Sequence, residues 1–349
     1  MIKPRNIHQP SQATMSGQPF SQPQTNDPFL HLKIISNPDG TITRLREDQH
    51  TPPSSNPNLP IPVLTKDITI NASHNTFARI FLPRKTLYPS SSSSSHKLPL
   101  IVYFHGGGFI FFSAASDFLH DLCSNLAKDV NSIVVSIDYR LAPEHRLPAA
   151  YDDAMEALHW IKTRPDEWLR KYADYSNCYI MGSSAGGNIA YHTCLRMAAE
   201  INLNHEYISP LNISGLILSQ PFFGGTKRLP SELRLLNDAV VPPHVCDLMW
   251  ELSLPLGVDR DHAYCNPTVG DGVGVLDRVR ELGWRVLVSG CEGDPLMDHQ
   301  MVMATVMEEK GVVVVRSFTA GGCHGVEVRD LIKRKQLHNL IKDFISFHQ

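Results

Sequence analysis

From residue 100 to the C-terminus, short continuous apolar runs alternate with amphipathic segments. Each run lacks the polar alternation of a half-exposed strand, so it suits a strand that is covered on both faces. The runs lie at residues 100–104, 133–137, 178–181, 216–218, 286–288 and 312–315, and segments with helical character lie at residues 116–128, 148–162, 185–198, 296–310 and 331–347. Strands and helices in alternation predict an α/β fold with a mostly parallel sheet flanked by helices.

Two of these predicted helices also begin with local signals. Ser116 is placed to cap the first of them, and Pro148 suits the start of the second. The exception to the alternation is the segment 226–257, which is helical in pattern but contains no strand. We therefore expect this insertion to form part of a cap over the functional site.

The N-terminal part of the chain predicts antiparallel structure. Asn-Pro-Asp-Gly at residues 37–40 favours a hairpin turn between short strands at 32–35 and 41–44. Residues 67–70 and 76–81 then alternate polar and apolar side chains, as half-buried antiparallel strands at a sheet edge do.

The domain organisation follows from length and composition. Residues 1–27 carry proline, serine and glutamine without an apolar period, which predicts a disordered N-terminal tail. A hydrophobic content of 42% provides ample material for a buried core in the remainder. Because α/β folds often form one large unit, we predict a single domain over residues 28–349 that includes the cap.

Charge and hydropathy exclude two classes of partner. The net charge is −3, from 32 basic and 35 acidic residues, and no lysine-arginine run supplies the field that binding to a phosphate backbone requires. The longest apolar stretches are broken well short of the length that spans a bilayer. We therefore expect neither a nucleic-acid nor a membrane partner.

Cysteine usage bears on the compartment. The seven cysteines are widely spaced and include no C-x-x-C pair, which suits reduced thiols in the cytoplasm, or also in the nucleus. The N-terminal segment has Lys3 and Arg5 but no acidic residue before Asp27, so an organelle transit peptide is the alternative to a plain tail. We expect a monomer or a weak homodimer.

The sequence Gly182-Ser183-Ser184-Ala185-Gly186 matches the pattern G-x-S-x-G of a nucleophile elbow. It lies where such an elbow must lie, after the run at 178–181 and before a predicted helix. A serine in so sharp a turn brings the residues two before and two after it together, and only glycine fits both places. The alternative is a tight strand-to-helix turn without chemistry, and the bare pattern arises by chance in roughly one chain in ten of this size.

A second motif, His105-Gly106-Gly107-Gly108, directly follows the run at 100–104. Glycines there allow the backbone to approach a substrate and to present N–H groups to an anionic oxygen. We assign an oxyanion hole to the amides of Gly107, Gly108 and Ala185. A flexible turn would explain the three glycines, but not their pairing with the elbow.

An acid and a base should follow the serine in that order, each in a loop after a later strand. Asp294 lies in the loop after the run at 286–288, whereas Asp298 should already belong to the next helix. His324 lies in a glycine-rich loop after the last predicted strand, a setting that His299 and His145 lack. We predict Ser184 as nucleophile, His324 as general base and Asp294 as the acid that orients it.

Four motifs together resemble the plant carboxylesterase family, within the hormone-sensitive-lipase-like group of α/β hydrolases and related to the gibberellin receptors. They lie at residues 105–108, 138–144, 182–187 and 294–298, and the resemblance extends from about residue 28 to the C-terminus. It implies an α/β-hydrolase fold with an eight-stranded sheet, a cap built partly from the N-terminal segment, and the same Ser-Asp-His triad. The stretch 138–144 resembles a structural motif of that family that packs behind the site.

One position departs from the family pattern. Where the commoner elbow has an acidic residue before the nucleophile, this chain has Ser183. A contact or a charge beside the site is therefore missing. We expect this to alter reactivity but not the type of reaction.

The predicted function is a carboxylesterase that forms an acyl-enzyme on Ser184 and needs neither a metal nor another cofactor. The cap segments lack a charge cluster, so a neutral small-molecule ester with a short or medium acyl group is expected. One alternative is a catalytically silent hormone receptor. The related receptors, however, have lost the triad histidine, which this chain retains as His324. A second is elimination or cyclisation, but the related isoflavanone dehydratases usually have threonine where this chain has Ser184.

Overall fold

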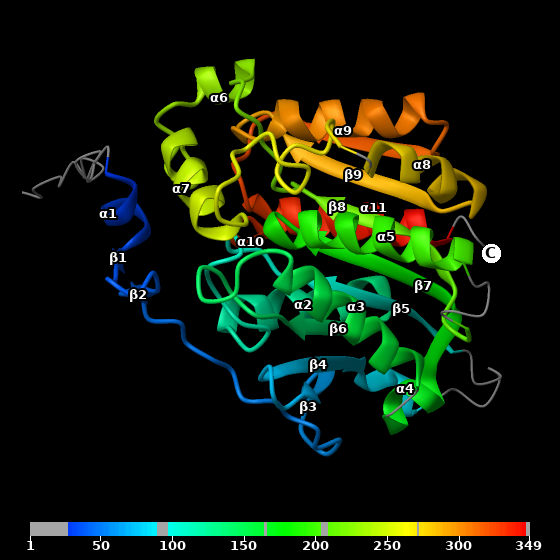
Figure 1. The fold of residues 1–349 in the computed structure, drawn as a ribbon. Coiled ribbons are helices and arrows are strands. Elements are labelled where there is room, and N and C mark those ends of the chain that lie inside the picture. Colours follow the sequence, from blue (N-terminus) through cyan, green and yellow to red (C-terminus); the bar gives the residue numbers. More distant parts are fainter. Residues whose placement is uncertain (1–26, 89–96, 164–165, 204–208, 271, 347–349) are drawn as a thin grey trace, which may run out of the picture.

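The computed structural model describes residues 27–88, 97–163, 166–203, 209–270 and 272–346 (Figure 1). The predicted tail therefore lies outside the described residues, apart from Asp27. Among the helices of the described ranges, none is long and apolar enough to cross a membrane.

Eight strands form one sheet in the order β10-β9-β8-β7-β5-β6-β4-β3. Their bounds are β3 (Val63–Asn71), β4 (Thr76–Pro83), β5 (Leu98–Phe104), β6 (Ile133–Asp138), β7 (Ala173–Ser183), β8 (Ile213–Ser219), β9 (Arg285–Cys291) and β10 (Val314–Thr319). β4 pairs antiparallel with β3 and β6, and every other pairing is parallel. The predicted eight-stranded, mostly parallel sheet is confirmed.

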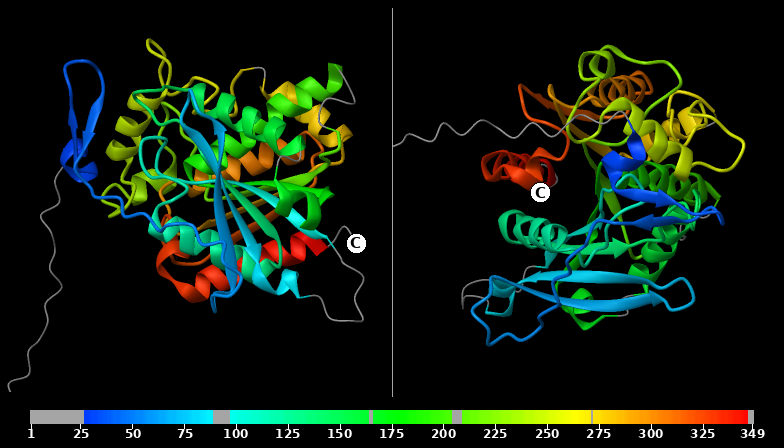
Figure 2. Two further views of the ribbon diagram at one scale, coloured as in Figure 1. Left: turned by 90° about the horizontal axis from the view of Figure 1, so that it is seen from below. Right: turned by 90° about the vertical axis from the view of Figure 1, so that its left-hand side faces the viewer.

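Helices cover both faces of this sheet, as the two views of Figure 2 show. α2 (Asp117–Val130) and α11 (Leu331–Ser346) pack on one face, against odd-numbered β5 residues such as Ile101. The other face, which includes Val102 of β5, is covered by α3 (Ala149–Lys162), α5 (Ala185–Leu203), α8 (Gly272–Glu281) and α9 (Met297–Glu309). Since neighbouring residues of β5 point to opposite faces and both are buried, the continuous apolar run is explained.

A cap lies beside the edge where the parallel strands end. It consists of α1 (Pro28–Leu32), the hairpin β1 (Ile34–Ser36) and β2 (Ile42–Arg44), α6 (Pro230–Arg234) and α7 (Pro243–Ser253). α1 packs against α7, so the N-terminal segment and the predicted insertion meet (Figure 1). Arg44 ties the hairpin to the body through hydrogen bonds to the carbonyls of Ile110 and Ala142 and an ion pair with Glu144.

Several local predictions were wrong in detail. β4 lies inside the sheet and is almost wholly buried, whereas a half-buried edge strand was predicted. The last strand begins at Val314 instead of residue 312, because the Val312 amide closes the C-terminal turn of α9 by donating to Met307. Ser116 precedes α2 as predicted, but its hydroxyl donates to Asp48 and makes no capping hydrogen bond.

The N-terminal hairpin is confirmed, but its first strand is shorter than predicted. Leu32 belongs to α1, a helix that the sequence analysis did not predict. The Asp27 carboxylate accepts from the amide of Phe29, and Pro28 occupies the first turn. An aspartate followed by proline is a usual helix start, so the signal was present.

Candidate active site

The turn between β7 and α5 holds Ser184 in a left-handed backbone conformation, with φ at 56°. A Cβ on Gly182 would collide with the carbonyl of Gly186, and one on Gly186 would collide with the carbonyl of Phe104. The turn is therefore possible only with glycine at both places. A non-glycine residue at positive φ is strained, and such strain is typical of functional turns.

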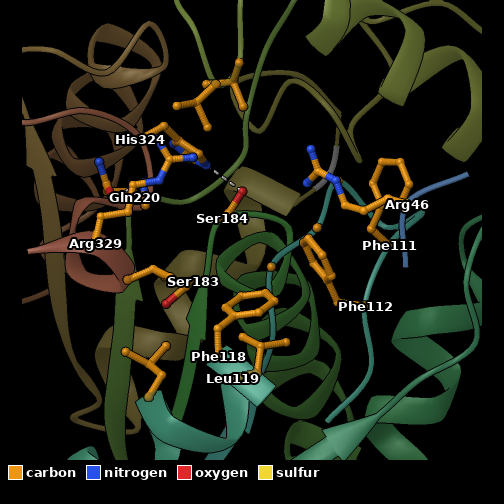
Figure 3. A pocket seen from close by; sticks show the side chains of 18 of the residues that line it. Arg46, Phe111, Phe112, Phe118, Leu119, Ser183, Ser184, Gln220, His324 and Arg329 are labelled. Carbon is orange, nitrogen blue, oxygen red and sulfur yellow. Dashed lines mark hydrogen bonds between the residues drawn. The ribbon is translucent and has the colours of Figure 1, made fainter. Parts of the chain in front are cut away.

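The side chains of Ser184, His324 and Asp294 form one hydrogen-bonded series (Figure 3). His324 Nε2 lies 2.8 Å from Ser184 Oγ, and His324 Nδ1 lies 2.9 Å from Asp294 Oδ2. A carboxylate only accepts, so Nδ1 carries the proton and Nε2 is free to accept from the serine hydroxyl. The structure thus brings together the three residues predicted as nucleophile, base and acid.

The pKa of His324 is raised above its ordinary value by the balance of two effects. Burial alone lowers it, but the charge and hydrogen bond of Asp294 raise it, with smaller contributions from the charges of Glu327 and Asp238. Raising this pKa means that the site stabilises the imidazolium form, which a general base must adopt after it takes a proton.

Two glutamines that the sequence analysis missed complete the surroundings of Asp294. Gln220 and Gln300 each donate from Nε2 to Asp294 Oδ2, both at 3.0 Å. Gln220 also donates to the Cys323 carbonyl at 3.1 Å and accepts from the Gly325 amide at 2.8 Å, so it holds the backbone on both sides of His324. The available signal was its position at the end of β8; Gln300, inside α9, had none.

The glycine loop after β5 lies directly against the nucleophile. A Cβ on Gly106 would lie 3.2 Å from Cβ of Ser184, and Gly107 and Gly108 have φ values of 121° and 61°. In the described contacts, the amides of Gly107, Gly108 and Ala185 donate no hydrogen bond to a protein acceptor. These are the three N–H groups that the sequence analysis assigned to an oxyanion.

His105, the first residue of this motif, has a different position. It is fully buried and stacks on the ring of Tyr139 with centroids 4.3 Å apart. The Tyr139 hydroxyl donates to the His105 carbonyl at 2.8 Å, and the Asp138 carboxylate accepts from the Ala114 amide at 2.7 Å. Residues 138–144 thus pack behind the glycine loop, as their predicted structural role requires.

A cavity of about 550 Å³ opens above Ser184. This volume lies in the range of small-molecule sites. Its wall includes His31 and Leu32 of the N-terminal segment together with Val241 and Met249 of the insertion, so both parts of the cap contribute. Aromatic and aliphatic side chains form much of the remainder, on the loop after β5 and the start of α2: Phe111, Phe112, Phe118, Leu119 and Leu122.

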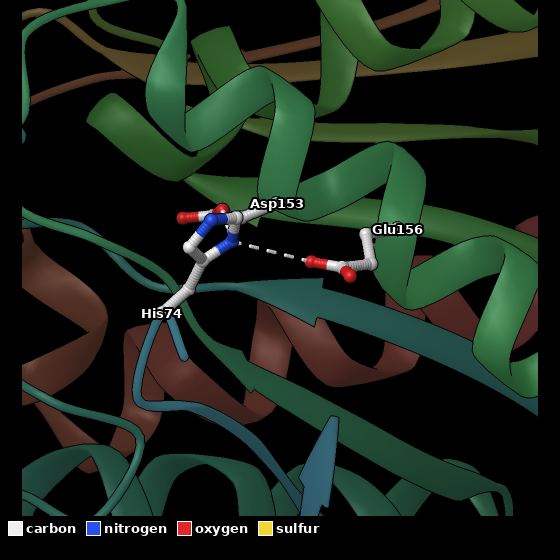
Figure 4. A group of neighbouring side chains, drawn as sticks. All are labelled: His74, Asp153 and Glu156. Carbon is white, nitrogen blue, oxygen red and sulfur yellow. Dashed lines mark ion pairs between the residues drawn. The ribbon is translucent and has the colours of Figure 1, made fainter. Parts of the chain in front are cut away.

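A second cluster of polar side chains, none of which lines this cavity, lies between the β3–β4 turn and α3 (Figure 4). His74, Asp153 and Glu156 offer ligand atoms within 4.8 Å of one another. However, Asp153 forms a 2.7 Å ion pair with Arg140, and Glu156 accepts from Asn71 at 2.7 Å. These contacts explain the cluster as packing of the turn against α3, and we assign no metal to it.

Comparison with known proteins agrees with the fold. The model of a family described as alpha/beta hydrolase fold matches residues 101–328. Carboxylesterase 20 of Arabidopsis thaliana is 51% identical over 91% of this chain and 96% of its own length. A 3-O-acetylpapaveroxine carboxylesterase of Papaver somniferum is 44% identical, over 91% of this chain and 99% of its own.

Among solved structures, an esterase of Pyrobaculum calidifontis superposes with a TM-score of 0.66 and 26% identity, over 84% of this chain and 87% of that one. The fold and the site define a member of the α/β-hydrolase family. More narrowly, the chain belongs to the plant carboxylesterases of the hormone-sensitive-lipase-like group, which are carboxylic ester hydrolases.

Proposed function

We propose that this carboxylic ester hydrolase works by two-step acyl transfer on Ser184. His324 takes the hydroxyl proton as Ser184 attacks the ester carbonyl, and Asp294 stabilises the imidazolium that results. His324 then protonates the leaving alcohol, and a water molecule activated by the same histidine releases the acid. The observation that carries this proposal is the pair of hydrogen bonds that His324 makes to Ser184 and Asp294.

The oxyanion of the tetrahedral intermediate is proposed to bind the amides of Gly107, Gly108 and Ala185. Two observations support this: Ala185 directly follows the nucleophile while Gly107 and Gly108 line the same cavity as Ser184, and all three amides donate to no protein acceptor in the described contacts. Donors that are already oriented stabilise the developing charge without reorganisation, and each is worth about 3 kcal/mol in sites of this kind.

For the substrate we propose a neutral ester with a short or medium acyl group. The cavity wall combines apolar side chains with charged residues of both signs: Arg46 and Arg329, and Glu47, Asp48, Asp117 and Glu327. A charged substrate of either sign would therefore meet repulsion as well as attraction, which favours a neutral one. The name of the Papaver somniferum relative, which specifies an acetyl ester, also supports a short acyl group.

A silent receptor is the competing function. The paired hydrogen bonds of His324 favour catalysis, because a site that only binds does not need a base aligned on a serine hydroxyl. We also propose a cytoplasmic location and a monomer or weak homodimer; the support for the location is the set of seven widely spaced cysteines.

The deciding experiment is hydrolysis of a p-nitrophenyl ester series by the purified full chain and by Ser184→Ala. The variant should lose roughly 10⁶-fold in kcat and all labelling by a fluorophosphonate probe. Ser132→Ala, which removes a buried hydroxyl away from the cavity, is the control and should retain both. Near wild-type hydrolysis by Ser184→Ala would exclude the mechanism.

A further inference from the structure

The cavity wall contains polar groups that take no direct part in acyl transfer. Ser183, Tyr103 and Glu327 all line it, and their exposed fractions are 8%, 0% and 4%. Around them the wall is apolar, with Leu119 and Leu122 of α2 among its members. In Figure 3, Ser183, Phe118 and Leu119 lie below Ser184, whereas Arg46 and Phe111 lie to its right.

Within the described part of the chain, the two hydroxyls make no hydrogen bond of ordinary geometry, although they are neighbours and Ser183 lowers the pKa of the Tyr103 phenol. This holds for Ser183 Oγ and for the Tyr103 phenol. Other buried hydroxyls also lack a partner, such as those of Ser132 and Tyr191, but neither of those residues lines the cavity. Buried polar atoms in native proteins are almost always satisfied, so two unsatisfied hydroxyls beside a ligand cavity point to a group that enters it.

Glu327 adds an acceptor to the wall of the same cavity. It lies in α10 (Val326–Arg329), directly after the His324 loop, and its carboxylate makes no ion pair within 4.0 Å and no side-chain hydrogen bond to another described residue. Burial raises the pKa of Glu327, so this part of the cavity wall disfavours charge. Burial is the main cause that raises the pKa of the Tyr103 phenol; Cys123 and, more weakly, Glu327 raise this pKa further, and the neighbouring Ser183 hydroxyl lowers it.

We propose that Ser183, Tyr103 and Glu327 form a subsite that binds a hydroxyl group carried by the substrate, on its acyl or its alcohol part. This proposal rests on the proposed esterase function and specifies its substrate class. A hydroxyl donates one hydrogen bond and accepts two, so it can donate to Glu327 while it accepts from Ser183 or Tyr103.

Other substituents fit this subsite less well. An alkyl group would leave all three polar side chains without partners. A carboxylate on the substrate would be repelled by the ionised form of Glu327. An ammonium group would lose its hydration, because the cavity wall around the three polar residues is otherwise apolar. A hydroxyl satisfies the subsite without burying a second charge.

The test uses two pairs of esters in which a terminal methyl is replaced by hydroxyl. p-Nitrophenyl heptanoate and 6-hydroxyhexanoate vary the acyl part; pentyl butanoate and 4-hydroxybutyl butanoate vary the alcohol part, and both pairs are extended to shorter and longer chains. The ratio of kcat/KM within a pair measures the preference. In one of the two series the wild type should prefer the hydroxyl ester by about tenfold, whereas an apolar wall would prefer the methyl ester.

Variants then assign the preference to the subsite. Ser183→Ala, Tyr103→Phe and Glu327→Gln should each reduce the ratio, and Ser183→Ala combined with Tyr103→Phe should bring it to one or below. Ser132→Ala and Tyr191→Phe make the same chemical changes at buried, unpartnered hydroxyls outside the cavity and should leave the ratio unaltered. General damage to the site lowers both members of a pair and leaves their ratio intact.

The possible failures are distinguishable. If the wild type hydrolyses the plain esters but no hydroxyl ester is preferred in either series, the subsite is wrong and the esterase function stands. A preference for the corresponding ammonium ester over the hydroxyl ester would also overturn it, because Glu327 would then select a cation. If no ester is hydrolysed, the proposed function fails and the subsite fails with it.

Discussion

At the scale of single residues, the carboxylate of Asp294 is fixed from four directions. Its Oδ2 accepts from His324, Gln220 and Gln300, and its Oδ1 accepts from the Leu296 amide. The residue is fully buried. A carboxylate held in this way keeps the imidazole in one tautomer and one orientation, which is what a serine nucleophile requires of its base.

The first prediction concerns the charge of Asp294. The wild-type kcat/KM should fall as the pH drops through a value above about 6.5, since His324 acts as a base only when neutral and its pKa is raised. Asp294→Asn removes the largest cause that raises this pKa, so the effect of burial remains and the acidic limb should move to lower pH. Turnover should fall by about 10³–10⁴-fold. A pH–rate profile with its acidic limb unchanged in the variant would contradict the assignment.

The second prediction separates the two glutamines. Gln220→Leu and Gln300→Leu each remove one donor from Asp294 Oδ2, but only the first also releases the backbone at Cys323 and Gly325. Gln220→Leu should therefore reduce kcat by about 10–100-fold, and Gln300→Leu by less than about tenfold. Steady-state kinetics on one ester, with thermal unfolding as a check on folding, make the comparison. Equal losses of kcat would mean that the hydrogen bonds of Gln220 to the backbone at Cys323 and Gly325 do not contribute to catalysis.

At the scale of elements, the parts of the fold that the sequence predicted are those with strong local signals. β5 and β6 are continuous apolar runs because both faces are covered, and the turn around Ser184 requires Gly182 and Gly186 whatever surrounds it. The carboxyl ends of parallel strands lie at one edge of a sheet. The order of strands and loops along the chain therefore already indicated that the loops with Asp294 and His324 lie near Ser184.

The features that the sequence did not predict depend on contacts between distant parts of the chain. Gln220 is an ordinary polar residue until folding brings it beside Asp294, which is 74 positions later. Likewise, β4 has the alternation of an edge strand, but β3 covers its outer side and makes it internal. The position of Gln220 directly after β8 was its only local signal, and the internal place of β4 had none, because both depend on residues that lie far apart in the sequence.

The third prediction belongs to the N-terminal hairpin. Arg44 joins it to the loop after β5 and to Glu144, while His31 and Leu32, close by in the chain, line the cavity. Arg44→Met should therefore loosen one wall of the cavity and raise KM several-fold, with a smaller change in kcat. Arg196→Met removes a surface ion pair with Asp152 on α3 and is the control. If kcat fell while KM stayed the same, the hairpin would act on the chemistry and not on binding.

At the scale of the whole molecule, the antiparallel end of the sheet, which pairs with the parallel part through β4 and β6, holds one buried cation. Arg79 of β4 is 1% exposed and pairs with Asp67 of β3 at 2.7 Å. Its guanidinium also donates to the Thr51 carbonyl at 2.8 Å, in the connector that leads from the cap. The residue therefore links β3, β4 and that connector.

The fourth prediction follows from this burial. Asp67→Asn leaves the charge of Arg79 buried without its counter-ion, and the free energy of unfolding should fall by about 2–3 kcal/mol, somewhat less than for a fully buried pair because Asp67 is itself 30% exposed. Asp152→Asn makes the same change in a surface pair with Arg196 and should cost less than about 1 kcal/mol. Urea denaturation measures both variants. Esterase activity per folded molecule should be retained, because Arg79 lies outside the cavity wall; equal losses of stability would show that burial of the guanidinium is not what makes the pair important.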